Sequence, residues 1–266
     1  MDILKKITET KAGEISNQKN LVTVEQLKRM KMFDRSCNSL KSSLLDQDSS
    51  GIIAEFKQRS PSAGPINIVS KVEQVTNDYV RAGAAGLSVL TDFEYFGGTL
   101  DNLVKARKAN SGSPLLRKDF ITDQYQIYES KAFGADVILL IAACLTKQKA
   151  ESLAKVAKNL GLEVIMEIHD SSELEMLNDF IDIVGINNRN LKTFKVDIQT
   201  SVTLSGKIPE KYLKISESGI SSPQNIKYLK QYGFKGFLIG ESFMRSNDPG
   251  LSCKEFIKEL WEIGSK

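Results

Sequence analysis

From residue 51 onward, short apolar runs alternate along the chain with longer amphipathic segments. The eight runs are GIIAEFK (51–57), GLSVL (86–90), PLLRKDF (114–120), ADVILLI (135–141), LEVIMEI (162–168), DIVGINN (182–188), YLKISES (212–218) and GFLIG (236–240). Because they are β-branched or leucine-rich and often begin at glycine or proline, they are typical of parallel strands buried on both faces. The segments at 69–84, 122–134 and 146–161 have helical spacing and close at or near glycine, the favoured residue just after a helix.

Eight strands that alternate with helices predict parallel strands joined by right-handed crossovers. Eight is also the number that closes a (β/α)₈ TIM barrel. An open doubly wound sheet is the alternative, but it usually carries a glycine-rich phosphate loop after its first strand, where this chain has Lys57-Gln-Arg-Ser-Pro-Ser62. We therefore predict an α/β fold, a (β/α)₈ barrel, in which residues 1–266 form a single domain.

Two helix starts are marked by capping residues. Asp170-Ser-Ser-Glu173 resembles a capping box, in which the first and fourth residues each bond the other's backbone. Ser222 precedes Pro223, and proline is favoured at the first position of a helix. We predict that a helix begins at each place.

Residues 1–50 do not share the alternation. They are polar and lysine-rich, and their apolar residues at helical spacing fall on two faces: Ile3, Leu4 and Ile7, then Val24, Leu27, Met30 and Phe33. This pattern predicts two or three short helices ahead of the first strand. We expect a helical N-terminal extension, 1–50, packed on the barrel; the alternative is a lid over an active site.

Composition and charge argue against several classes of protein. The formal net charge is +3, and scattered lysines do not form the basic stripe of a nucleic-acid-binding domain. Three cysteines without a CxxC spacing and a single histidine, His169, argue against disulfides and a metal site. The N-terminus lacks a signal-peptide run, and no stretch is long enough to span a bilayer. We expect a cytoplasmic protein, by default a monomer, with no metal, nucleic acid or membrane as partner.

The predicted strands end in functional groups rather than in ordinary turn residues. Such groups close five runs: Glu55 with Lys57, Lys118, Glu167, Asn187 with Arg189, and Glu217. In a (β/α)₈ barrel the carboxyl ends of all strands surround the same mouth, where active sites lie. One charged residue among strand apolars could be a buried ion pair, since unpaired burial is costly. Five strand ends with such groups together predict an active site.

The turns after the last two strands indicate a phosphate site. Ser218-Gly219 follows the seventh run, and Gly240-Glu241 follows the eighth and could begin a short helix. In these barrels phosphate lies on the loops after strands seven and eight, where backbone N–H groups and a helix N-terminus favour a dianion. The simpler alternative is that both glycines only permit tight turns. Given the barrel, we expect a phosphorylated small-molecule substrate.

These segments resemble the motifs of the indole-3-glycerol-phosphate synthase family. The matching segments occur in the family's order, from about residue 50 to the end: IIAEFKQRSPSAG, LSVLTDFEYFGG, LLRKDFITDQYQI, EVIMEIHD, VGINNRNL, KISESGI and FLIGESFM. The resemblance implies a carboxy-lyase of tryptophan biosynthesis. Its substrate would be 1-(2-carboxyphenylamino)-1-deoxyribulose 5-phosphate, converted to indole-3-glycerol phosphate by a decarboxylating and dehydrating ring closure. No cofactor is implied, in agreement with the few histidines and cysteines.

The resemblance also implies roles for the two lysines. Lys118 would be the general acid that protonates the carbonyl oxygen during ring closure. Lys57 would hold the substrate's carboxylate and could act as acid in the dehydration. Burial and the charge of Lys57 would lower the pKa of Lys118, while neighbouring glutamates would raise it. The sequence leaves this balance open.

Four further positions would support the lysines. Glu167 would stabilise positive charge on the substrate's nitrogen or serve as a base in dehydration. Glu55 would orient the lysines and assist proton transfer. Asn187 and Glu217 would bind substrate hydroxyls or hold the lysines in place.

The remaining implied residues bind the substrate. Phosphate would be held by Ser60, Ser218, Gly219, Gly240 and Glu241. Arg189 would brace the site. Phe96 and Phe120 are candidates for the aromatic pocket, although Phe96 could instead pack on a helix. Leu139 and Ile141 could join that pocket but are expected to be core residues.

Two family positions differ and one residue stands outside the implied mechanism. Gln58 stands where many members carry a basic residue. Glu241 stands where some have serine, so its side chain must turn away from the phosphate. His169 is expected to be structural or to support its neighbour Glu167.

Two other functions fit parts of the pattern. A phosphoribosylanthranilate isomerase would favour an aspartate and a cysteine as acid and base, whereas this mouth offers lysines and glutamates. A non-catalytic barrel that binds phosphorylated metabolites would keep Ser218-Gly219 and Gly240 but lose the acids and bases, which this chain retains.

Overall fold

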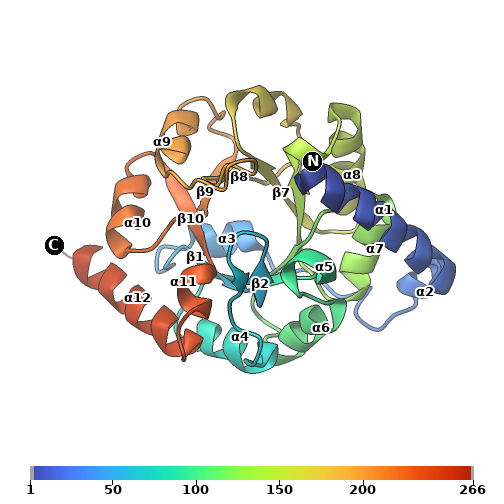
Figure 1. The fold of residues 1–266 in the computed structure, drawn as a ribbon, viewed down its shortest axis with the longest axis horizontal. Coiled ribbons are helices and arrows are strands. Elements are labelled where there is room, and N and C mark those ends of the chain that lie inside the picture. Colours follow the sequence, from blue (N-terminus) through green and yellow to red (C-terminus); the bar gives the residue numbers. More distant parts are fainter. Residues whose placement is uncertain (1–2, 265–266) are drawn as a thin grey trace.

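A closed parallel barrel forms the centre of the molecule (Figure 1). The computed structural model describes residues 3–264. Within them, eight strands close in the order β1-β10-β9-β8-β7-β6-β5-β4. Their bounds are β1 (Ile52–Phe56), β4 (Gly86–Leu90), β5 (Leu115–Lys118), β6 (Val137–Ile141), β7 (Glu163–Ile168), β8 (Ile183–Asn187), β9 (Leu213–Glu217) and β10 (Phe234–Ile239). The predicted (β/α)₈ fold is confirmed, and each strand lies within or overlaps one of the eight apolar runs.

Helices surround the barrel and cover the outward faces of the strands (Figure 1). The outer elements are α4 (Val72–Arg81), α6 (Leu100–Ala109), α7 (Gln124–Ala132), α8 (Lys147–Asn159), the 3₁₀ helix η2 (Ser171–Met176), α9 (Gln199–Ser205), α10 (Pro223–Lys230) and α12 (Pro249–Gly264). Shorter elements lie in the loops: β2 (Arg59–Ser60), β3 (Gly64–Pro65), α5 (Phe93–Phe96), the 3₁₀ helix η1 (Ala142–Cys144) and α11 (Glu241–Met244). The small hairpin β2–β3 was not predicted. Among the described residues, no helix is both long and apolar enough to cross a membrane.

One of the two predicted helix starts differs from its expected geometry. Ser222 forms a capping box with Asn225, and Pro223 begins α10 as predicted. Asp170 caps a 3₁₀ helix instead of an α-helix, and its carboxylate accepts from Ser172 N. Glu173 does not complete a capping box with Asp170, because its carboxylate accepts the backbone N–H of His169. The prediction of a capping box at this position was wrong.

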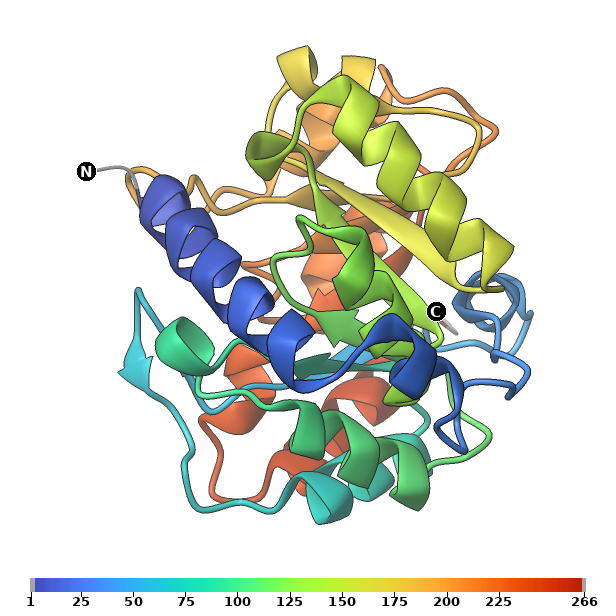
Figure 2. The ribbon, with the colours of Figure 1, turned by 90° about the vertical axis from the view of Figure 1, so that its right-hand side faces the viewer.

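The N-terminal segment contacts both ends of the barrel. It contains α1 (Ile3–Leu21), α2 (Val24–Lys28) and α3 (Leu40–Leu45). Figure 2 shows α1 lying across one end, beside the hairpin that follows β1, while the chain around α3 lies at the opposite end. Met30 and Phe33 do not share a helix face with Val24 as predicted, because α2 ends at Lys28. They still pack beside Leu27 in a small apolar cluster.

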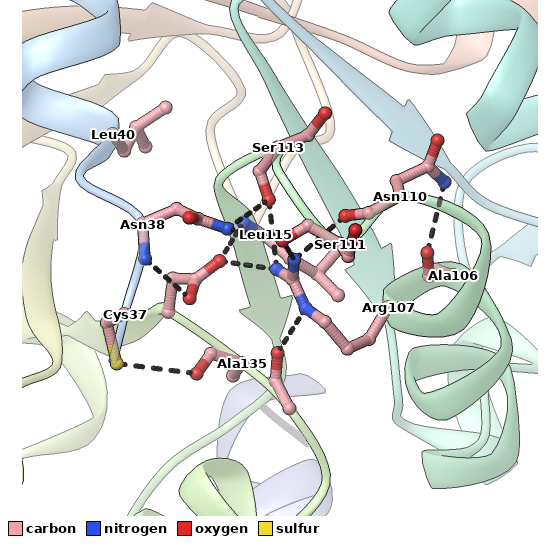
Figure 3. A network of polar contacts seen from close by, with 12 residues as sticks. Cys37, Asn38, Leu40, Ala106, Arg107, Asn110, Ser111, Ser113, Leu115 and Ala135 are labelled. Carbon is pink, nitrogen blue, oxygen red and sulfur yellow. Dashed lines mark hydrogen bonds and ion pairs between the residues drawn. The ribbon is translucent and has the colours of Figure 1, made fainter. Parts of the chain in front are cut away.

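The opposite, amino-terminal end of the barrel is closed by α3 and by a buried ion-pair network. Leu40 and Leu44 of α3 join the apolar side chains inside the barrel. Asp136, fully buried, pairs with Arg107 and with Arg35, whose Nη1 lies 2.5 Å from its carboxylate. Arg107 also donates to backbone carbonyls of the loop after α6 (Figure 3). These contacts fix the part of the N-terminal segment around Arg35 and α3 at the end of the barrel away from the functional groups.

Candidate active site

A cavity of about 430 Å³ opens at the carboxyl ends of the strands. Its lining includes every residue predicted for the site: Glu55, Lys57, Ser60, Phe96, Lys118, Glu167, Asn187, Arg189, Glu217, Ser218, Gly219, Gly240 and Glu241. These residues come from the strands or the loops that follow them, and the barrel closure brings them together. Their individual roles stay predictions, and the geometry below defines what each can do.

Lys118 lies at the centre of the cavity between two carboxylates. Its Nζ is 2.7 Å from Glu167 Oε2 and 2.5 Å from Glu217 Oε2. Residues Glu167 and Glu217 are only 3% and 2% exposed, so water screens the pairs weakly. Asn187 donates from Nδ2 to the other oxygen of Glu167, at 3.1 Å. The ammonium group of Lys118 on β5 is therefore fixed by the carboxylates of Glu167 on β7 and Glu217 on β9. Asn187, on the strand β8 between them, holds the carboxylate of Glu167.

The environment decides the protonation of Lys118 that the sequence left open. Burial alone would lower its pKa, but the charges of Glu167, Glu217 and Glu55 outweigh burial and raise the pKa well above its usual range. Lys118 is therefore an ammonium ion over the whole neutral range. The same cluster raises the pKa of Glu217 to about 7, because burial and the repulsion from Glu167 and Glu55 outweigh the attraction of Lys118. Glu167 is held ionised, since Lys118 and its hydrogen bonds offset burial and lower its pKa.

Glu217 has an oxygen that no side chain pairs. Among the described residues, its buried Oε1 has no hydrogen-bond partner. That oxygen lies against the backbone of Gly185 on β8, where a Cβ atom would collide with it. An unpaired buried carboxylate oxygen is costly when it is ionised, in agreement with the raised pKa of Glu217.

A second lysine–glutamate pair lies beside the first. Lys57 Nζ is 2.9 Å from Glu55 Oε1, and Ser88 on the neighbouring strand donates to Glu55 Oε2 at 3.3 Å. Glu55 is 3% exposed, whereas Lys57 follows β1 and is more accessible from the cavity. The inner part of the cavity thus holds two lysines, Lys57 and Lys118, that pair with the glutamates Glu55, Glu167 and Glu217. Such closely spaced acids and bases can transfer protons without a metal ion.

The turn after β9 is held in a conformation that favours an anion site. Ser218 has φ +67° and Gly219 has φ +76°. For serine this left-handed conformation is strained, and such strain is maintained only where surroundings impose it. Asn188, which is buried, donates to Ser218 O at 3.0 Å and to Ser216 Oγ at 2.9 Å. Ser218 and Gly219 both line the cavity, and the backbone N–H groups of such a turn can form an anion-binding concavity.

The turn after β10 carries the charged rim. Gly240 precedes α11, and Glu241 is the first residue of that short helix. The carboxylate of Glu241 accepts from Arg245 at 2.8 Å and lies 3.6 Å from Arg189. Glu241 therefore faces two guanidinium groups at the rim of the cavity. The backbone at the start of α11 remains available to an anion.

The other side of the cavity is apolar. Phe96 of α5 faces Phe120 at 6.1 Å between ring centroids. Leu139 and Ile141 also line the cavity. Both are buried core residues as expected, and they contribute to the pocket as well. The structure places Phe96 at the pocket rather than solely against a helix.

The sequence did not predict two kinds of residue at the site. The N-terminal helix contributes Ile3, Leu4 and Ile7, so α1 forms part of the cavity wall. Arg245 lines the rim, four residues after Glu241. Asn188 closes the sixth run together with Asn187 and Arg189 and was given no role of its own from the sequence. The structure shows that Asn188 holds the Ser218 turn without lining the cavity.

The closed barrel, with a cavity at its strand ends that holds paired lysines and glutamates, defines a (β/α)₈-barrel enzyme whose reactive groups are lysines and glutamates. The family model for indole-3-glycerol phosphate synthase matches residues 4–258. The chain belongs to that family, whose members are decarboxylating lyases of tryptophan biosynthesis.

Individual relatives agree with this assignment. The chain is 46% identical over 259 residues to an indole-3-glycerol phosphate synthase from Bacteroides thetaiotaomicron, covering 97% of this chain and 99% of the relative. It is 40% identical over 262 residues to one from Polaromonas naphthalenivorans, with coverage of 97% and 99%.

Solved structures with little sequence similarity share the fold. A 3-hexulose-6-phosphate synthase from Salmonella typhimurium has a TM-score of 0.64 at 14% identity, covering 80% of this chain and 99% of its own. A tryptophan synthase alpha subunit from Legionella pneumophila has a TM-score of 0.62 at 13% identity, with coverage of 85% and 98%. At these identities the likeness shows the barrel and nothing about substrate.

Proposed function

We propose that the cavity converts 1-(2-carboxyphenylamino)-1-deoxyribulose 5-phosphate to indole-3-glycerol phosphate, carbon dioxide and water. The observation that carries this proposal is the central position of Lys118, which is held between Glu167 and Glu217 with an apolar wall on one side and the Ser218 turn on the other. The family membership supports the same reaction. An extended substrate with an aromatic ring at one end and a phosphate at the other matches this division of the cavity.

The aromatic ring would occupy the apolar side, between Phe96, Phe120 and the first turns of α1. The phosphate would bind at the turns after β9 and β10, through backbone N–H groups of Gly219 and Glu241. Ser60, buried in the loop after β1, would add a hydroxyl from the opposite rim. The ribulose carbonyl would then lie over the two lysines. Positioning both ends would hold the ring carbon near the carbonyl carbon, which lowers the entropic cost of closure.

In the first step the ring carbon that bears the carboxylate would attack the ketone carbon. A new carbon–carbon bond forms, and the carbonyl oxygen takes the proton of Lys118. The raised pKa of Lys118 keeps the group protonated at neutral pH, so a proton is available, and the negative charge that develops on the carbonyl oxygen would draw that proton from it. Its fixed charge would also stabilise negative charge as it develops on oxygen. Loss of carbon dioxide would then return its bonding electrons to the ring.

In the second step the new hydroxyl would leave as water and the adjacent carbon would lose a proton, which completes the indole. Lys57 would first hold the substrate's carboxylate and later donate a proton to the departing hydroxyl. Glu167, held ionised, would stabilise positive charge on nitrogen or accept the proton. Glu55 fixes Lys57, and Asn187 and Glu217 would hold hydroxyls or the central lysine. Arg189 would brace the phosphate rim.

The direct test is a fluorescence assay for indoleglycerol phosphate with the purified protein and the synthetic carboxyphenylamino substrate. We expect turnover by the unaltered protein and near-complete loss in Lys118→Ala with substrate binding largely retained. Lys105→Ala, an exposed position on α6, is the matched control and should turn over normally. Comparable turnover in Lys118→Ala would exclude the proposed mechanism.

A further inference from the structure

His169 lies directly after β7 between two glutamates. Its Nε2 is 3.3 Å from Glu167 Oε1, and its Nδ1 is 3.4 Å from Glu173 Oε2. The backbone N–H of His169 also donates to Glu173, at 2.5 Å, which fixes Glu173 against the strand end. The ring therefore bridges a carboxylate inside the site and one outside it. His169 is not among the residues that line the cavity.

The surroundings of the ring favour its charged form. Burial alone would lower the pKa of His169, but the facing carboxylates of Glu167 and Glu173 raise the pKa to about 10. The pKa of Asp170, the next residue, is lowered mainly by the hydrogen bond from the Ser172 hydroxyl, and the positive charge of His169 adds a smaller lowering. The cation that faces this group from inside the barrel is Lys118, on the far side of Glu167.

Glu167 lies close to three nitrogen groups. Oε2 pairs with Lys118 and Oε1 accepts a hydrogen bond from Asn187 Nδ2, while His169 Nε2 faces Oε1 at 3.3 Å as an ion pair without hydrogen-bond geometry. A carboxylate held by donors on both oxygens cannot rotate freely, so its second oxygen stays directed at Lys118. The hydrogen bonds at the start of η2 also help to hold the His169 ring in place. Because Glu173 binds the His169 backbone instead of closing a capping box, it is placed to hold the far side of the ring.

We infer that His169 is a positioning residue: a doubly protonated imidazole that bridges Glu173 to Glu167 and holds Glu167 ionised and oriented toward Lys118. The kinetic effect expected of His169 rests on the proposed function, whereas the protonation state of its ring does not. His169 contacts no substrate in this arrangement. It acts through Glu167, as outer groups orient the groups that react.

The ring itself can be observed without any activity. His169 is the single histidine of the chain, so a tag-free ¹⁵N-labelled protein gives one pair of imidazole nitrogen signals. We expect both nitrogens to remain protonated well above about pH 6.5, the value of a free histidine. Glu173→Gln and Glu167→Gln should each lower the titration midpoint, since each removes a facing charge. A midpoint near about 6.5 in the unaltered protein, or one that neither variant moves, would overturn the inference.

Kinetics test the positioning. His169→Gln keeps an N–H donor without charge, and His169→Leu keeps neither. We expect kcat to fall about tenfold in the glutamine variant and about a hundredfold in the leucine variant, with KM nearly unchanged, because a misplaced catalytic group costs rate. The acid limb of kcat/KM should move to higher pH in both, since Glu167 loses a neighbouring positive charge and its pKa rises.

A purely structural histidine predicts a different result. It would lower the melting temperature of the variants and leave the acid limb where it is, and that outcome contradicts the inference. If the unaltered protein forms no indoleglycerol phosphate, the proposed function fails, while the nitrogen titration still decides the state of the ring. The two failures are therefore distinguishable.

Discussion

A Cβ atom built on Gly240 would lie 2.5 Å from Oε1 of Glu55. Gly240, the first residue after β10, is thus packed against the carboxylate of Glu55 on β1, which pairs with Lys57. The two strands are neighbours in the closed barrel, so the phosphate turn and the proton-transfer groups share a contact. Gly240 was singled out in the sequence for phosphate binding alone. The structure gives it a second reason to be glycine.

Gly240→Ala should therefore lower kcat as well as raise KM. The added methyl displaces Glu55, which in turn misplaces Lys57, and a displacement of this kind costs about tenfold to a hundredfold in rate. Steady-state kinetics with the carboxyphenylamino substrate measures both constants. Gly206→Ala is the matched control, because nothing lies within 4 Å of a Cβ built there. A rise in KM with unchanged kcat would mean that Glu55 adapts without consequence.

Lys118→Arg should be nearly as inactive as Lys118→Ala. A guanidinium keeps the positive charge between Glu167 and Glu217, but its planar, delocalised group is larger than an ammonium and cannot place one nitrogen where Nζ lies between the two carboxylates. We expect kcat to fall by about a thousandfold with substrate binding retained. Single-turnover fluorescence together with equilibrium binding separates the two effects. Activity within tenfold of the unaltered protein would show that charge alone suffices.

Glu217→Gln should make the protein more stable at alkaline pH. The pKa of Glu217 is raised to about 7 in the folded protein, above its ordinary value of 4.5, so folding favours the protonated form. Stability from this group is therefore complete below pH 4.5 and is lost as pH rises toward 7. The glutamine variant lacks this loss and should be more stable by about 2 kcal/mol at pH 8 and by less at pH 5. Urea unfolding at pH 5 and pH 8 measures the free energy of unfolding of both proteins. An equal stability difference at the two pH values would contradict the raised pKa of Glu217.

Lys11→Met should loosen the N-terminal helix from the barrel. Lys11 on α1 is 4% exposed, and its Nζ lies 2.9 Å from Asp92 and 3.2 Å from Asp119, the residue after Lys118. Removing the ammonium leaves Asp92 buried without its counter-charge, which should cost about 3 kcal/mol of unfolding free energy. KM should rise, because α1 supplies part of the apolar wall. Chemical unfolding and kinetics below the melting transition measure the two effects, and Lys6→Met on the exposed face of α1 is the control.

The sequence determined the barrel and the identity of its chemical groups. Strand runs are short, local and buried on both faces, so their number and order are visible without tertiary contacts. Because parallel strands present their carboxyl ends at one mouth, the groups that end β1, β5, β7, β8 and β9 could be placed together from their positions in the chain. The turn glycines were visible for the same reason, since a turn depends on local backbone conformation.

Tertiary structure decided the relationships across the mouth. The pKa of Lys118 depends on Glu167 and Glu217, which lie far away in sequence, and only the closed barrel sets their distances. The contribution of α1 to the cavity wall was likewise not visible in any local pattern. His169 was expected to be structural or to support Glu167, but the contact of its ring with Glu173 was not predicted. Periodicity specifies which face of an element is buried, but not which side chain of another element it meets. Strand register and barrel closure fix those contacts, and through them the protonation and orientation of the reactive groups.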